Sequence, residues 1–235
     1  MMTTGDIYYK QNTYKIIAIL LMFLDHVGAL FNIIGFRIFG HICIMLFLYS
    51  YVHGLSLSKG LNIKKLIKLA AIGLIAQPFY IYLFDSKALN IFFLYLLYYI
   101  FKYFESNNKY INFIQFLMFC SLTFILNIEY WFFGFSVLYV YDKVKNIKIQ
   151  NCLNLALNII FIIYAYYVYD TMIFILQPFT LLLIHEINKG SFTIKFPVHK
   201  NVFYLFYPTH LFLLCIIKYF LWAAAMRFFF FSFAL

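Results

Sequence analysis

Residues 14–34 read YKIIAILLMFLDHVGALFNII, an apolar run that carries Asp25 and His26 near its middle. A run of about 20 apolar residues is long enough to cross the ~30 Å hydrocarbon core of a bilayer as an α-helix. Counting about 1.5 Å per residue from Lys15 places the pair about 15 Å into the membrane. An ionised side chain at that depth costs about 2.5–3.5 kcal/mol. The pair therefore needs partners in the interior of a helix bundle.

The rest of the chain has the same character. Of its 235 residues, 66% are hydrophobic and 11% are charged, against about 25% charged in ordinary soluble domains. We therefore expect one all-α, polytopic transmembrane helical bundle over residues 1–235. Hydropathy predicts about nine spans, with a range of eight to ten because the sixth is short. The expected spans are 14–34, 38–57, 63–84, 88–104, 110–128, 130–141, 152–169, 171–187 and 201–222.

Basic residues indicate the orientation, because Lys and Arg accumulate on cytoplasmic loops. With about nine spans and a cytoplasmic N-terminus, most of the 18 basic residues fall on the cytoplasmic side. This alternation explains the net charge of +10 without a nucleic-acid partner. The residues assigned to the cytoplasm are Lys10, Lys15, Lys59, Lys64, Lys65, Lys68, Lys102, Lys109, Lys143, Lys145, Lys148, Lys189, Lys195 and Lys200.

A third polar residue lies at the depth of the first pair. Counting from Lys200 places His210 level with Asp25 and His26. Consecutive residues of a helix lie about 100° apart, so Asp25 and His26 can face different partners. A buried carboxylate and a histidine at one level are suited to orienting and accepting a proton, and the alternative is an interhelical hydrogen bond that only stabilises the bundle. His41, one turn inside the second span, is a weaker candidate.

Several enzyme classes lack support in the sequence. It contains no GxxxxGK[ST], GxSxG, HExxH or GxGxxG motif, the signatures of nucleotide hydrolases, common serine hydrolases, zinc peptidases and dinucleotide enzymes. The four cysteines are far apart and form no CxxC pair, so we expect neither a disulfide framework nor a metal site. The first helix follows a polar N-terminus without a cleavage site, so we expect it to remain in the mature protein.

Motifs along the chain carry a family resemblance. The segment Met22-x-x-Asp25-His26-x-Gly28-x-x-Phe31 resembles the opening signature of the TraX family of bacterial membrane proteins, named for the F-pilin acetylase. Further segments follow the order of that family over nearly the whole chain, with His41 at the place of an Arg. They are Gly40 with Phe47, Lys65 to Leu69, Gln77-Pro78-Phe79, Asn90-Ile91-Phe92-Phe93, Tyr130 with Gly134, and Tyr207-Pro208-x-His210-Leu211.

The resemblance implies a multi-pass acyltransferase of the bacterial inner membrane. It would transfer an acetyl or other short acyl group from acyl-CoA, without a metal, to an amine or hydroxyl of a peptide, pilin-like, glycan or other cell-surface acceptor. Its expected partners are membrane lipid, acyl-CoA and that acceptor. His26 would be the general base, Asp25 its orienter or charge partner, and His210 a second base or carbonyl polariser. The residues expected to bind acyl-CoA are His41, Lys65, Lys68, Gln77, Asn90 and Tyr207.

Some of these residues have simpler explanations. Asn90 opens a span and suits a helix N-cap, and Gln77-Pro78 suits a plain helix kink. The basic loop of Lys59, Lys64, Lys65 and Lys68 can bind phosphates or serve only to orient the chain. Two other function classes remain open: a small proton-coupled transporter, for which internal repeats are expected but not seen, and a non-catalytic assembly factor.

Overall fold

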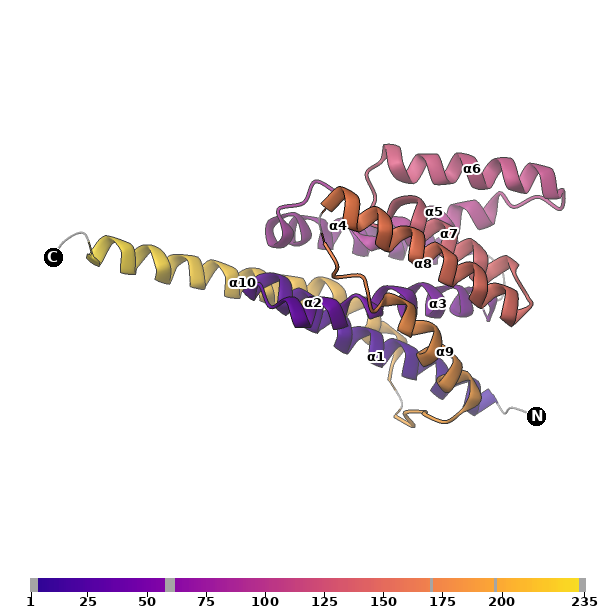
Figure 1. Cartoon of the computed structure of the whole chain (residues 1–235), viewed down its shortest axis with the longest axis horizontal. Coiled ribbons are helices and arrows are strands. Elements are labelled where there is room, and N and C mark those ends of the chain that lie inside the picture. The colour runs from indigo at the N-terminus through magenta and orange to yellow at the C-terminus, as the bar shows by residue number, and fades with distance from the viewer. Residues whose placement is uncertain (1–3, 58–61, 170, 197, 233–235) are drawn as a thin grey trace.

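The computed structural model describes residues 4–57, 62–169, 171–196 and 198–232. Lys59 of the predicted basic loop lies outside them. Within these ranges the chain is all-helical (Figure 1). The helices are α1 (Thr4–Phe31), α2 (Ile34–Gly40), α3 (Ile42–Ser56), α4 (Ile63–Phe84), α5 (Ile91–Tyr103), α6 (Lys109–Ile125), α7 (Trp131–Lys143), α8 (Ile147–Tyr169), the 3₁₀ helix η1 (Gln177–Phe179), α9 (Thr180–Lys189) and α10 (Lys200–Ser232).

Five helical segments in the described part of the chain are long and apolar enough to cross a membrane. They match the first, second, third, seventh and ninth predicted spans, and the second is made by α2 and α3 together. The prediction of an all-helical membrane protein is therefore confirmed. The five segments are Tyr8–Phe31, Ile34–Ser56, Ile63–Phe84, Ile147–Val168 and Asn201–Ala224.

The remaining predicted spans are shorter or broken. Helices α5 and α7 have 13 residues each, about 20 Å of helix, which is less than the ~30 Å hydrocarbon core. Both bury about half or more of their residues among the neighbouring helices. The expected span 171–187 was wrong as one helix, because η1 and α9 replace it. Pro178 lies in the first turn of η1, has no backbone N–H, and disfavours helix at the preceding residue.

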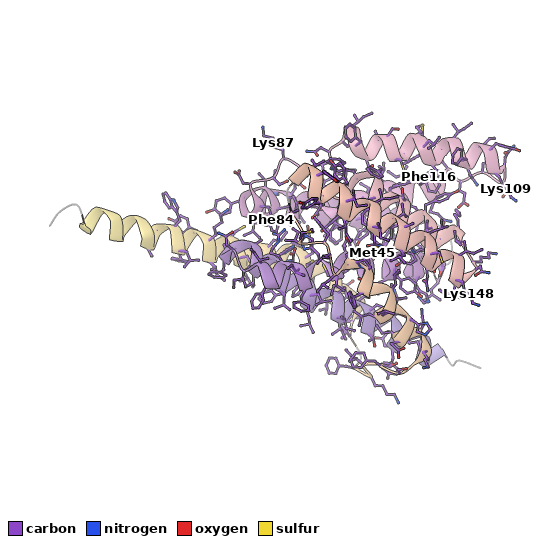
Figure 2. The ribbon with its side chains drawn as sticks, viewed as in Figure 1. Met45, Phe84, Lys87, Lys109, Phe116 and Lys148 are labelled. Atoms are coloured by element: carbon purple, nitrogen blue, oxygen red, sulfur yellow. The ribbon has the colours of Figure 1, made fainter. Side chains whose placement is uncertain are left out.

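The two ends of the bundle carry the loops that the charge pattern assigns to opposite sides of the membrane. Figure 2 shows Lys87 at one end, with Lys109 and Lys148 at the other. Helix α1 begins at the Lys148 end, whereas α10 ends beyond the Lys87 end and extends past the rest of the bundle (Figure 1). This arrangement agrees with the expected alternation. The cytoplasmic location of the N-terminus and the count of nine spans stay predictions.

A tight reversal after α1 positions the first polar centre. Asn32 takes a left-handed conformation (φ 55°), and the N–H of Ile33 donates to the carbonyl of Gly28 at 2.9 Å, a common helix ending. Helix α2 therefore packs back along α1. A Cβ atom at Gly40 would overlap the Cβ of Asp25, so only glycine permits this approach.

Candidate functional site

A cavity of about 340 Å³ opens between α1, α2, α4, α7, α8 and the loop that joins α6 to α7. Aromatic side chains also line the cavity. One of them, Phe84, lies toward the Lys87 end of the bundle (Figure 2). On the predicted topology this is the outer side. The charged, hydroxyl and imidazole side chains that line the cavity are Asp25, His26, Arg37, His41, Tyr80, Ser86, Glu129, Tyr130 and Tyr164.

Asp25 is the centre of a buried charge cluster. Its Oδ1 atom lies 2.7 Å from Nδ1 of His41 and 3.3 Å from Nε of Arg37. The contact with His41 is close, although its geometry is not that of a linear hydrogen bond. Asp25 is 8% exposed and His41 3%. A carboxylate removed from water needs such partners, and Arg37 and His41 supply them.

His26 faces a different helix. Its Nδ1 atom lies 2.7 Å from Nε2 of His210, and the ring planes differ by 15°. Nδ1 of His210 lies 2.8 Å from the carbonyl oxygen of Phe206. Because a carbonyl only accepts, that nitrogen carries the proton, and Nε2 of a neutral His210 then accepts from Nδ1–H of His26. This chain of hydrogen bonds leaves the lone pair of His26 on Nε2, available as a base.

The pairing differs from the sequence interpretation in one respect. The expectation that Asp25 and His26 face different partners is confirmed. However, the acyl-transfer interpretation had made Asp25 the orienter of His26, and the structure places it against His41 instead. The reason is that α2 and α10 both pack against α1, and consecutive residues of a helix point about 100° apart, so each reaches a different neighbour.

Sequence reasoning passed over Glu129 and Arg37, because both fall next to predicted loops. Glu129 lies in the α6–α7 loop and accepts hydrogen bonds from the Tyr80 hydroxyl and the backbone N–H of Ile91. Burial, with the Asp25 charge nearby, raises the pKa of Glu129 to about 8. The sequence does contain a signal for Glu129, because an acidic residue stands there at the break between two short apolar runs.

Two of the residues expected to bind acyl-CoA, Asn90 and Gln77, form hydrogen bonds that connect neighbouring helices. Oδ1 of Asn90 accepts from the N–H of Phe92 at 3.0 Å, so the N-cap alternative is confirmed. Nδ2 of Asn90 donates to Gly73 and to Gln77, and Nε2 of Gln77 donates to Ala88, each at 2.8 Å. These bonds join α4 to the start of α5. Helix α4 itself continues through Pro78.

Lys65 lies at the opposite end of the helices. It lines a second cavity, of about 250 Å³, together with Lys15, Tyr51 and Tyr204. Lys68 does not line this cavity: its Nζ donates to Oδ1 of Asn201 at 2.8 Å.

Tyr207 lines neither cavity but packs against Phe92 and His210. Its ring centroid is 5.0 Å from that of Phe92, which lines the second cavity, and 5.6 Å from that of His210. Among the described residues, no three His, Cys, Asp or Glu side chains are grouped as a metal site requires.

The fold and the polar centre together define an integral membrane protein with a buried histidine–carboxylate site. A family model described as "TraX protein" matches residues 10–218, and the chain belongs to the TraX family. No curated protein and no solved structure matches it.

Proposed function

We propose that this protein is an integral membrane acyltransferase, which transfers an acetyl or other short acyl group from acyl-CoA to an amine or hydroxyl of a peptide, pilin-like or cell-surface acceptor. One observation carries the proposal: His26 lies at a cavity within the bundle, held by His210 so that its Nε2 lone pair is free. Membership of the TraX family supports the same reaction class.

The arrangement of the histidines supports a mechanism of acyl transfer. Nε2 of His26 takes the proton as the acceptor nitrogen or oxygen bonds to the acyl carbonyl carbon. The C–S bond of the thioester then breaks, and the proton returns to the leaving thiolate to give free CoA. The bond to His210 fixes the tautomer of His26 and spreads the positive charge that forms on it. His41, which contacts Asp25, is the proposed polariser of the carbonyl oxygen.

The second cavity is the proposed entry for acyl-CoA. Lys15 and Lys65 bring two positive charges to it, which suits the phosphates of the CoA nucleotide. It lies at the predicted cytoplasmic end, where acyl-CoA is available. Lys15 and Asp25 are about 15 Å apart along α1. The ring of Tyr207 lies beside Phe92, which lines the second cavity, and beside His210.

A thiol-release assay tests this function. Purified protein in detergent micelles, given acetyl-CoA and a cell-envelope peptide extract, should release CoA with time. His26→Ala should lower the rate on the order of 10²- to 10⁴-fold, the usual contribution of a general base. His199→Ala, which removes an exposed histidine, is the matched control. Acetylated envelope peptides that disappear when the gene is deleted would identify the acceptor. Absence of CoA release by the wild-type protein would contradict the proposal.

A further inference from the structure

Glu129 is fixed at the cavity by its backbone. Its N–H donates to the carbonyl of Leu89 at 2.8 Å, and the N–H of Leu89 donates to the carbonyl of Asn127 at 2.8 Å. The pairing of Leu89 with Ile128 is a short parallel bridge. The α6–α7 loop is therefore joined to the segment before α5, and Glu129 lines the same cavity as Asp25.

The backbone on both sides of Glu129 is strained. Asn127, Tyr130 and Trp131 have φ values of 48°, 62° and 32°, in the left-handed region that residues with a Cβ rarely adopt. Such conformations persist only where the surrounding structure enforces them, and they are enriched at functional sites. Three of them around one cavity-lining carboxyl group indicate that its placement has a function.

The Glu129 carboxyl group has less charge compensation than Asp25, because the Arg37 charge acts on it only from a distance. Asp25 has Arg37 and His41 as ion-pair partners, whereas among the described residues no Lys, Arg or His forms an ion pair with Glu129. Its recorded partners are the Tyr80 hydroxyl and a backbone N–H. A positively charged ligand bound in the cavity would favour the ionised form of this carboxyl group, because an opposite charge nearby lowers the pKa of an acid. The titratable and charged groups that line the cavity with Glu129 are Asp25, His26, Arg37, His41, Tyr80, Tyr130 and Tyr164. Cys43, Tyr95 and Tyr207 also interact electrostatically with Glu129.

We propose that Glu129 is a specificity-determining residue, which binds the ammonium group of a cationic acceptor and accepts its first proton. This inference rests on the proposed acyltransferase function. The step converts R–NH₃⁺ and the carboxylate into R–NH₂ and a neutral carboxylic acid. The second proton passes to His26 as the new C–N bond forms.

A hydroxyl acceptor loses only one proton, so it needs His26 and not Glu129. The chemistry of Glu129 fits the first transfer. Its pKa of about 8 is nearer to the pKa of ~10.4 of an alkylammonium group than an ordinary carboxyl pKa is. Glu129 therefore selects amines over alcohols.

A matched pair of acceptors tests the selection. With acetyl-CoA at pH 7, Glu129→Gln should lower kcat/KM for butylamine on the order of 10²-fold and change the value for butanol less than about threefold. Raising the pH toward about 10 should reduce the butylamine deficit, because the free amine then forms in solution. Glu129→Asp should restore part of the rate. Glu186→Gln, at an exposed position of α9, is the control.

Binding supplies an outcome that does not depend on turnover. Trp131 lines the cavity, and Trp222→Phe would leave it as the one tryptophan of the chain. In that variant butylammonium should change Trp131 fluorescence more strongly than butanol, and Glu129→Gln should remove the difference.

The outcomes separate the two proposals. Equal losses for both acceptors in Glu129→Gln, or fluorescence responses unchanged by that substitution, would overturn the role of Glu129. A wild-type protein that binds butylammonium through Glu129 but never releases CoA would retain the cation site and refute the acyltransferase.

Discussion

Nδ1 of His26 lies 2.7 Å from Nε2 of His210, although 184 positions of the sequence separate the two residues. The contact joins α1 to α10, and the carbonyl of Phe206 sets its direction from the other side. The position of one proton in the centre of the bundle thus depends on both the first and the last described helices.

That dependence predicts the effect of His210→Ala. Without a partner for Nδ1, His26 is free to change tautomer, and kcat for CoA release should fall on the order of 10²-fold with little change in the KM for acyl-CoA. Steady-state thiol release measures both constants. An unchanged kcat would show that His210 has no part in orienting the base.

Gly40 should be essential for the geometry around Asp25. Gly40→Ala places a methyl group where the Cβ of Asp25 lies, so α1 and α2 must separate. We expect loss of CoA release and a lower unfolding temperature in micelles. Gly35→Ala on the same helix meets no atom within 4 Å and should leave both measurements close to wild type. If the two variants behave alike, the close approach is not what matters.

Asp25→Asn should destabilise the protein through Arg37 and His41. Removal of one partner leaves a cation without its counter-charge, at a cost of about 3 kcal/mol. Thermal unfolding monitored by circular dichroism measures the change. Arg37→Met in the Asp25→Asn background should recover part of the loss. Asp85→Asn, at an exposed helix end, is the control.

Glu129 should make stability depend on pH. Burial raises the pKa of its carboxyl group in the folded protein to about 8, from an ordinary value of 4.5. The folded state therefore holds a proton that the unfolded chain has lost, and stability should fall as the pH rises between these two values. Unfolding temperatures measured from about pH 5 to about pH 8 test this dependence. Glu129→Gln should flatten the profile, and an unchanged slope would contradict the assignment.

Lys65 should bind the phosphates of the acyl donor. Lys65→Gln is expected to raise the KM for acetyl-CoA on the order of 10-fold and to leave the KM for acetyl-pantetheine, which lacks the nucleotide, unchanged. Lys64→Gln, an exposed neighbour outside the second cavity, serves as the comparison. An equal effect on both donors would argue against phosphate binding.

The sequence predicts the depth of the polar residues better than their pairing. Counting along helices placed His210 level with His26, because helical rise is regular and the basic loops mark the helix ends. The Asp25–His41 contact depends on the reversal at Asn32, which turns α2 back onto α1 and leaves no periodic signal.

The cavity-lining position of Glu129 and the burial of α5 and α7 were also not predicted, because both depend on how distant segments pack. Glu129 follows the end of α6, so the sequence predicts a loop residue there. The Leu89–Ile128 bridge holds that loop where Glu129 lines the cavity. Helices α5 and α7 are apolar enough to be taken for spans, but apolarity does not distinguish a helix buried in protein from one that crosses lipid. The centre of the bundle was therefore predictable and the rim of the site was not.

The position of His210 on α10 also bears on biogenesis. During synthesis, α1 enters the membrane with Asp25 and His26, and the partners of the carboxylate, Arg37 and His41, follow 12 and 16 residues after Asp25. His26 gains its partner only when α10 has been inserted, after the rest of the described chain has been made. A chain that stops before α10 thus has the contacts of Asp25 but lacks the His210 partner of His26. The proposed acyl transfer would therefore begin only after α10 has packed against α1.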